Sequence, residues 1–133
     1  MEALVTLERL TEAIGARPLQ IEAATHDAYV AAISHLPFLL SAALVQHVAN
    51  DERWAEMQRL AATGFRDVTR LASGDPAMHR DICLTNSTMI QAELREMAQL
   101  LSELAAHLDD SSYLETFFNS AQSHRGAWLR QRS

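Results

Sequence analysis

The sequence predicts an all-α protein, a helical bundle, from three observations. Apolar residues recur at steps of three and four through most of the 133-residue chain, which is the spacing of amphipathic helices. Only one short stretch, residues 17–22, alternates apolar and polar side chains as a strand does. No internal repeat or low-complexity tract interrupts this plan.

The N-terminal part is expected to be the end of a separate domain. In residues 2–16, leucines and an isoleucine share one helix face, and Gly15 supplies a stop signal. A brief strand follows at 17–22, and a helix with one strand does not make a sheet. We therefore expect residues 1–24 to be the tail end of a domain that is missing here, and residues 25–133 to form the helical domain.

A long apolar helix is expected next, because residues 28–50 contain no Asp, Glu, Lys or Arg. Thr25 can cap this helix, and Asp27 lies in its first turn, where the helix dipole favours a carboxylate. Pro37 is expected to kink it, since an interior proline removes a backbone hydrogen bond. The segment is long enough to span a membrane, but its polar residues and the lack of basic flanks favour a core helix in a cytoplasmic protein.

Further helices are expected from capping signals. A helix capped by Asn50 or Asp51 should run to Gly64, and residues 65–73 should form a short helical or irregular turn. Asp75-Pro76 places a capping residue before a proline at the first helical position, and so opens a long helix. That helix carries a seam of apolar residues spaced by three and four, namely Ile90, Leu94, Met97, Leu101, Leu104 and Leu108. A capping box, Ser112-Tyr113-Leu114-Glu115, predicts the last helix.

The charge-free helix at 28–50 also bears on assembly. A helix that is apolar all round must be covered on every side, which few other helices in the chain can provide. An intertwined homodimer with the apolar seam in its interface would cover it, and closed pairs are the commonest soluble oligomers. A compact monomeric bundle with this helix at its centre is the alternative.

Composition excludes several function classes. The formal charge of −6 and the absence of a basic run argue against nucleic-acid binding. Cys83 is the single cysteine, and the histidines are dispersed, so neither a disulfide nor a metal site is expected. The four glycines do not form a dinucleotide or phosphate loop, and no nucleophile motif is present.

A few residues remain that can carry binding chemistry. His35 lies within the charge-free helix, as a ligand contact or as a structural histidine with satisfied ring nitrogens. Arg66 and Arg70 would share a helical face, and a guanidinium binds a carboxylate with two hydrogen bonds. The alternative is a solvated face with a weak ion pair to Asp67. Asn86 is a polar contact or a buried amide with partners.

Five short motifs follow one another along the chain. They are His26-Asp27, Ser34-His35-Leu36-Pro37, Gly64-Phe65-Arg66-Asp67-Val68-Thr69-Arg70, Ser73-Gly74-Asp75-Pro76 and Arg80-Asp81-Ile82-Cys83-Leu84-x-Asn86. Over roughly residues 17–133, their order and spacing resemble the C-terminal helical (dimerisation) domain of the prephenate and arogenate dehydrogenase family. That family also includes cyclohexadienyl dehydrogenases and acts in tyrosine biosynthesis.

The resemblance implies an NAD- or NADP-dependent oxidoreductase acting on prephenate or arogenate by oxidative decarboxylation. In that family an N-terminal Rossmann domain binds the nucleotide and carries the catalytic histidine, and the helical domain forms a homodimer. By the resemblance, residues 1–24 are a helix and strand left from the end of that nucleotide-binding domain, and residues 25–133 are the dimerisation and substrate-site domain. By this resemblance the chain holds no catalytic, cofactor-binding or metal-binding residue, and alone it is expected to be inactive and to bind no cofactor. Neither nucleic acid nor a membrane is an expected partner.

The resemblance also implies roles for particular residues. Arg70 matches the arginine that binds a substrate carboxylate, and His35 matches the first histidine of a Ser-His-Leu-Pro-His signature. Phe38 stands where that signature has its second histidine. Gly64 joins the expected substrate-binding set on other grounds, because a glycine lets a ligand or a neighbouring backbone approach closely. His79 stands at an aromatic position that reaches toward the partner subunit in some relatives. These two departures, Phe38 and His79, keep open a second hypothesis, a free-standing non-catalytic helical dimer that binds a small ligand or regulates.

Overall fold

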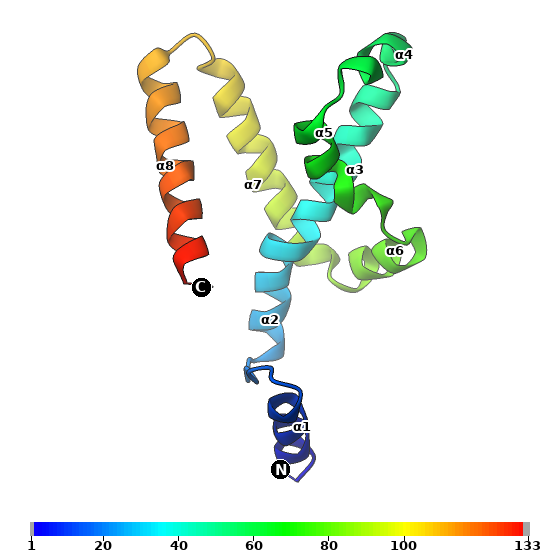
Figure 1. The fold of residues 1–133 in the computed structure, drawn as a ribbon, viewed down its shortest axis with the longest axis vertical. Coiled ribbons are helices and arrows are strands. Elements are labelled where there is room, and N and C mark those ends of the chain that lie inside the picture. Colours follow the sequence, from blue (N-terminus) through cyan, green and yellow to red (C-terminus); the bar gives the residue numbers. More distant parts are fainter. Residues whose placement is uncertain (1, 132–133) are drawn as a thin grey trace. The chain divides into compact units, whose positions relative to one another are not determined.

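The computed structural model describes residues 2–131, and every regular element among them is a helix, which confirms the all-α class (Figure 1). The chain divides into two compact units, Met1–Ile90 and Gln91–Ser133. Each unit is described by itself. The elements of the first unit that carry the predicted site are the long apolar helix and the short helices that pack on it.

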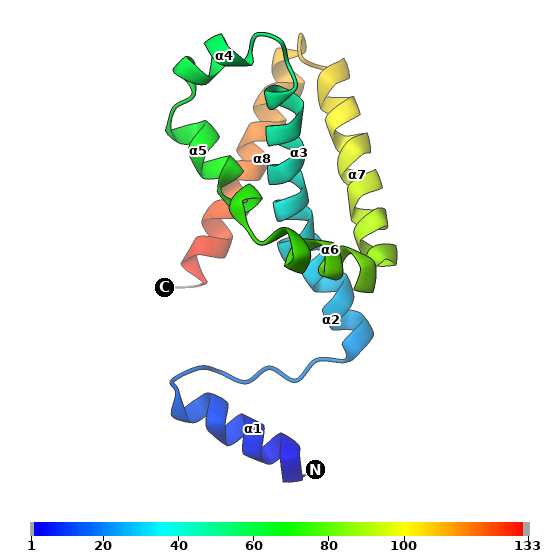
Figure 2. The same cartoon turned by 90° about the vertical axis from the view of Figure 1, so that its right-hand side faces the viewer.

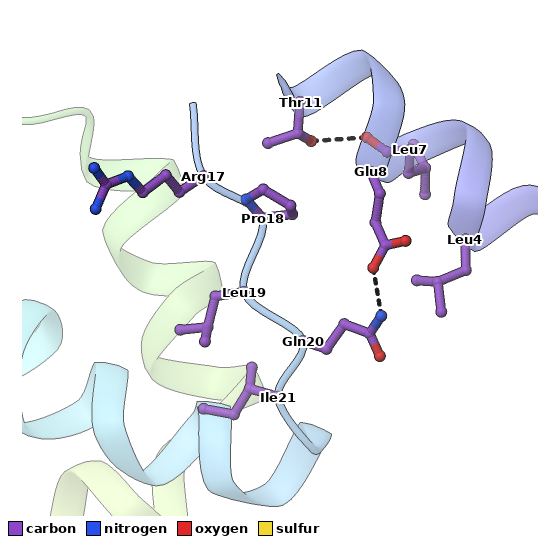
Figure 3. Close-up of a pocket in the computed structure, with 9 residues that line it drawn as sticks. All are labelled: Leu4, Leu7, Glu8, Thr11, Arg17, Pro18, Leu19, Gln20 and Ile21. Atoms are coloured by element: carbon purple, nitrogen blue, oxygen red, sulfur yellow. Dashed lines mark hydrogen bonds between the residues drawn. The ribbon is translucent and has the colours of Figure 1, made fainter. Parts of the chain in front are cut away.

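The first helix, α1, spans Glu2–Ala13 and ends before Gly15, whose φ of +79° is a conformation that favours glycine. The strand predicted at 17–22 is not formed. An extended segment becomes a strand only when a neighbouring strand pairs with it, and the described residues contain none. Instead, the segment lines an open groove of about 590 Å³ together with α1, and Gln20 donates a hydrogen bond to Glu8 across it (Figure 3).

The apolar stretch forms one continuous helical rod, seen as the blue-to-cyan ribbon in Figures 1 and 2. It consists of α2 (Ala23–Val30), a π-helical turn η1 (Ala31–His35) and α3 (Leu36–Ala49). The cap is Glu22 rather than the predicted Thr25, because the Glu22 carboxylate accepts a hydrogen bond from the Thr25 N–H at 3.1 Å.

The irregularity expected at Pro37 takes the form of the π-turn just before it. Proline has no N–H to donate to the preceding turn, and its ring crowds the carbonyl four residues earlier. The backbone widens ahead of it, so the Leu36 N–H reaches back five residues to the carbonyl of Ala31. Such π-turns are frequent at functional sites.

This rod, Ala23–Ala49, is long and apolar enough to cross a membrane by length and composition. Its most apolar window has a mean hydropathy of 1.8, and 22% of that window is buried. One such helix is weak evidence for a membrane span, because core helices of soluble proteins have the same composition. The low burial means that residues 2–131 do not enclose this helix.

Short helices fold back along α3. They are α4 (Trp54–Met57), the 3₁₀ turn η2 (Gln58–Leu60), α5 (Thr63–Thr69) and the 3₁₀ turn η3 (Arg70–Ser73). The helix predicted to run from Asn50 or Asp51 to Gly64 is therefore broken into two short pieces. Residues 65–73 are helical, as predicted. The Ala72 N–H donates a 2.9 Å hydrogen bond to the hydroxyl of Ser41 in α3, which fixes η3 against the rod.

The next helix, α6 (Pro76–Thr85), begins as predicted. Asp75 accepts a 2.8 Å hydrogen bond from the Met78 N–H, and Pro76 occupies the first turn. The single long helix predicted from this point is wrong, because α6 ends at Asn86 and α7 (Ser87–Ala106) starts anew. Asn86 adopts φ −121° and ψ 32°, and its side chain is bonded outside the helix.

The buried core of the first unit is small and centres on the π-turn and the start of α3. The buried apolar residues among those described are Ala31, Leu36, Phe38 and Ile90, and Ser41 is the buried polar one. Ile90 lies in the part of α7 that belongs to this unit. Phe38, one of the predicted site residues, is therefore itself part of this core.

The second unit pairs the rest of α7 with α8 (Ser111–Arg130) as an antiparallel hairpin (Figure 1). The cap of α8 is Asp110, which accepts hydrogen bonds from the backbone N–H groups of Ser112 and Tyr113, both at 3.0 Å. The predicted cap, Ser112, is therefore wrong, and Asp110, two residues earlier, caps the helix instead. Along α7 the predicted seam is largely open, with Leu101 52% and Leu108 65% exposed.

Candidate functional site

His35 ends the π-turn and is half-buried. Asn86, the residue between α6 and α7, contacts its ring. The Asn86 Nδ2 lies 3.5 Å from the His35 Nδ1, and it donates a 2.8 Å hydrogen bond to the backbone carbonyl of Asp27. A carbonyl on α2, an amide between two helices and an imidazole on the π-turn therefore form one chain of polar contacts. This arrangement fixes the direction in which the His35 ring points.

The charge state of His35 follows from its surroundings. Burial lowers the pKa of His35 below its ordinary value of 6.5, because a charged ring loses solvation there. The carboxylate of Asp27 opposes this shift and the nearby His26 adds to it. His35 is therefore neutral at physiological pH and acts as a hydrogen-bonding group rather than as a cation.

Phe38, one turn further along, lies between two imidazoles. Its ring is 7% exposed and stacks on the ring of His79, with 4.1 Å between centroids and 2° between planes. The His35 ring lies 6.0 Å from the same phenyl group at a tilt of 53°. The structure thus brings His35, Phe38 and His79 together. In the sequence His79 lies in a separate segment from the other two, and no motif predicts their contact.

Arg70 and Gly64 lie on the segment that folds back along α3. Arg70 is exposed at the start of η3, and its side chain makes no ion pair or hydrogen bond within residues 2–131. Asp67, expected as the partner of Arg70, instead faces Arg66, whose Nε lies 3.5 Å from the carboxylate. Gly64 lies in α5, and a Cβ added there would meet nothing within 4 Å. The structure therefore distinguishes the two arginines: Arg66 has a partner and Arg70 has its donors free.

Ser41 was missed by sequence reasoning, and so was the way Asn86 acts. Ser41 is 1% exposed and accepts the hydrogen bond that anchors η3, two residues after Arg70. The available signal was a hydroxyl inside a charge-free helix, because a buried hydroxyl requires a partner. Asn86 is recognisable from the sequence as a polar residue in an apolar stretch. Its distance from His35 along the chain does not predict their contact.

Within the part of the chain that the structure describes, no group of three or more His, Cys, Asp or Glu side chains is arranged to hold a metal ion. The arrangement that does exist is an apolar ring flanked by two imidazoles, with a free guanidinium on the neighbouring segment.

Comparison with known proteins assigns the chain to a family. The model of the prephenate dehydrogenase dimerization domain matches residues 22–121. The chain belongs to this family. The match includes the whole apolar rod and the residues His35, Phe38, Arg70 and His79.

Relatives and solved structures agree with this assignment. The chain is 33% identical to the prephenate dehydrogenase of Bacillus subtilis over 98% of its own length, and 30% identical to the cyclohexadienyl dehydrogenase of Zymomonas mobilis over 93%. The arogenate dehydrogenase of Synechocystis is similar with a TM-score of 0.84 and 29% identity, over 96% of this chain and 48% of that one. A prephenate dehydrogenase from A. aeolicus, solved with hydroxyphenyl propionate and NAD+, shares the fold at a TM-score of 0.81 and 24% identity.

The family member described here spans less than half of those enzymes. It covers 36% of the Bacillus subtilis protein and 44% of the Zymomonas mobilis protein. The match is therefore to one helical part of a larger dehydrogenase, the part that the family model describes as a dimerization domain.

Proposed function

We propose that this chain is the dimerisation and substrate-site part of an NAD- or NADP-dependent prephenate or arogenate dehydrogenase. The observation that carries the proposal is the match of the dimerization-domain model over residues 22–121, a range that contains the whole His35–Phe38–His79 cluster. The named relatives are all dehydrogenases of cyclohexadiene substrates.

Arg70 binds a carboxylate of the substrate in this proposal. Its exposed side chain has no partner among the described residues, so forming a bidentate pair costs it no existing contact. The hydrogen bond that the Ala72 N–H donates to the Ser41 hydroxyl holds the backbone near Arg70 in place. Because the backbone is already ordered before the ligand arrives, the entropic cost of binding is smaller.

His35 orients the substrate through a hydrogen bond. Its pKa is lowered by burial, so the ring is neutral and has one donating and one accepting nitrogen. Because Asn86 approaches the Nδ1 atom, the Nε2 atom is the one left for the ligand. Phe38 is buried, and its ring packs beside His35 with 6.0 Å between the ring centroids, which supports the imidazole from within the protein.

The nucleotide belongs to another part of the assembled enzyme. The four glycines of this chain do not form a phosphate-binding loop, and residues 2–131 contain no strand on which such a loop could be mounted. When bound, NAD(P) would accept the hydride that the substrate ring loses as its carboxylate departs as carbon dioxide. The residues of this chain contribute binding and orientation to that reaction.

The assembly proposed is a homodimer in the cytoplasm. Residues 2–131 leave most of the apolar rod uncovered, and the family to which the chain belongs is described as a dimerization domain. A second copy would supply the missing cover and remove the rod from water. The rod lies inside the family match, which supports a protein environment for it rather than a lipid one.

The test is an assay of the full-length protein from the complete reading frame, following reduced nucleotide formation with prephenate or arogenate and with NAD+ or NADP+. Turnover with one of these pairs supports the proposal. Absence of turnover with every pair, in a folded dimer, would overturn it and favour a binding or regulatory module. The 133-residue chain alone serves as the control without a nucleotide-binding domain.

A further inference from the structure

Asn86 lies at the break between α6 and α7, where φ is −121° and ψ is 32°. Its backbone groups keep partners in the two helices despite the break. The Asn86 N–H donates to the carbonyl of Ile82 at 3.1 Å, and the Asn86 carbonyl accepts from the Ile90 N–H at 3.2 Å. The side chain can therefore reach away from α6 and α7, and it contacts the apolar rod.

The Asn86 amide meets the rod on both sides of the π-turn. Its Nδ2 donates a 2.8 Å hydrogen bond to the carbonyl of Asp27 in α2, a carbonyl that also accepts from the Ala31 N–H within the rod. The same Nδ2 lies 3.5 Å from the Nδ1 of His35, the last residue of the π-turn. One amide nitrogen thus spans the turn and ends at the imidazole.

The bond to the Asp27 carbonyl determines which way the amide faces. A backbone carbonyl can only accept a hydrogen bond, so Asn86 must present its nitrogen there and not its oxygen. The nitrogen carries two hydrogens, and the one that does not bond to Asp27 is left for His35. The Nδ1 of His35 must then accept, which it can do only without a proton. A neutral imidazole with a bare Nδ1 carries its proton on Nε2.

The neutral state that this reasoning requires agrees with the surroundings of the ring. Burial lowers the pKa of His35, and this effect outweighs the opposing carboxylate of Asp27. That carboxylate is itself 3.1 Å from the Nδ1 of His26, which lowers the pKa of His35 further. The amide of Asn86 adds a geometric constraint, because a donor facing Nδ1 leaves no place for a second proton on the ring.

We propose that Asn86 is a positioning residue of the substrate site, which holds His35 in the tautomer protonated at Nε2, so that His35 presents a hydrogen-bond donor to an oxygen of the substrate. The inference rests on the proposed function and deepens it, because it assigns the direction of the hydrogen bond between His35 and its ligand. Asn86 acts through His35 and does not itself touch the substrate.

The test reads the tautomer in the full-length enzyme labelled with carbon-13 histidine, since the Cδ2 chemical shift differs between the two neutral tautomers. The His35 signal is the one that is missing in His35→Gln. At mildly alkaline pH, wild-type His35 should show the form protonated at Nε2. Asn86→Asp keeps the shape of the side chain but replaces its donors by acceptors, so it should move the proton to Nδ1. Asn86→Ala should let the two forms mix.

Kinetics of the same variants connect the tautomer to the substrate. Asn86→Asp and Asn86→Ala should each raise KM about 2- to 10-fold, the loss of one neutral hydrogen bond, with kcat within about 2-fold of wild type. Asn119→Asp is the matched control, because it makes the same substitution at an exposed position on α8. It should keep the wild-type His35 signal and the wild-type KM.

The outcomes separate this inference from the proposed function. Wild-type His35 protonated at Nδ1, in an active enzyme, would overturn the inference alone. So would an Asn86→Asp variant in which either the His35 signal or KM stays as in wild type, whatever its melting temperature, because Asn86 would then be only structural. An enzyme without dehydrogenase activity would overturn the proposed function and the substrate contact together. A wild-type signal of the Nε2 form that changes together with KM in Asn86→Asp supports the inference.

Discussion

The hydroxyl of Ser41 accepts a hydrogen bond from the backbone N–H of Ala72 at 2.9 Å, and this bond joins α3 to η3 across a long stretch of sequence. Ser41 is 1% exposed, so water does not compete for the contact. The bond satisfies a polar group inside an otherwise apolar rod. It also sets the position of the segment that carries Arg70, which links the stability of the core to the geometry of the site.

Ser41→Ala should therefore destabilise the protein and loosen η3. The variant leaves the Ala72 N–H without its partner in a partly buried place, and such a loss costs about 1–3 kcal/mol of unfolding free energy. Chemical denaturation of the chain measures it. Ser34→Ala is the matched control, because Ser34 is an exposed serine on the same rod without a side-chain hydrogen bond. Equal stability of the two variants would show that the Ser41 bond contributes nothing.

Arg70→Ala should mainly weaken substrate binding in the full-length enzyme. Loss of a charge-assisted bond to a carboxylate costs about 1.5–3 kcal/mol, which is roughly a 10- to 150-fold rise in KM. Arg66→Ala should have a much smaller effect, since Arg66 already faces Asp67. Steady-state kinetics measure both, and nucleotide binding should not change in either. A normal KM in Arg70→Ala would remove Arg70 from the site.

The sequence predicted the fold class correctly because helical periodicity is a local signal that survives without tertiary context. The breaks were harder to predict. The long helix expected after Asp75 is divided at Asn86, where the side chain bonds to the carbonyl of Asp27 instead of facing solvent. That bond joins residues far apart in sequence, so no pattern within a short window predicts it. The strand expected at 17–22 failed for a related reason, because a strand depends on a partner outside its own segment.

The sequence names candidate residues for the site, but it does not predict the contacts among them. His35 and Phe38 were singled out in the apolar helix, and His79 was singled out on α6. The stack between Phe38 and His79 depends on how α6 crosses the rod and on the absence of a side chain at Gly74. Contacts of this kind are set by tertiary packing, which motif spacing does not encode.

The cap of α8 offers a direct test of the observed structure against the sequence pattern. Asp110 accepts two backbone N–H bonds at the start of the helix, whereas the sequence pattern favoured Ser112. Asp110→Ala should lower the unfolding free energy by about 1 kcal/mol, the usual value of a lost cap. The adjacent Asp109→Ala is the control, since Asp109 is exposed and bonds to none of the described residues. If Ser112→Ala were the costlier change, the capping box would be the better description.

Stability should fall as the pH drops below 6.5, in part because of His35. Burial lowers the pKa of folded His35 below its ordinary value of 6.5, so the unfolded chain takes up a proton first as the pH falls. The stabilisation by neutral His35 is thus fully present above pH 6.5 and is lost as the pH falls toward the folded pKa. Thermal unfolding of wild type and His35→Gln, on both sides of that pH, measures it. If the stability of wild type and of His35→Gln fell equally steeply as the pH dropped, His35 would be excluded as the cause.

Self-association of the chain through the apolar seam of α7 is the last prediction. Leu101 is 52% exposed and lies on that seam, and burying a leucine of this kind contributes about 1.5–3 kcal/mol. Wild type should sediment as a dimer, and Leu101→Glu should shift it toward monomer because a buried carboxylate without a partner opposes association. Gln99→Glu adds the same charge at an exposed position off the seam, so it should remain dimeric. A monomeric wild type, or a Leu101→Glu variant that dimerises as tightly as Gln99→Glu, would show that this seam is not the interface.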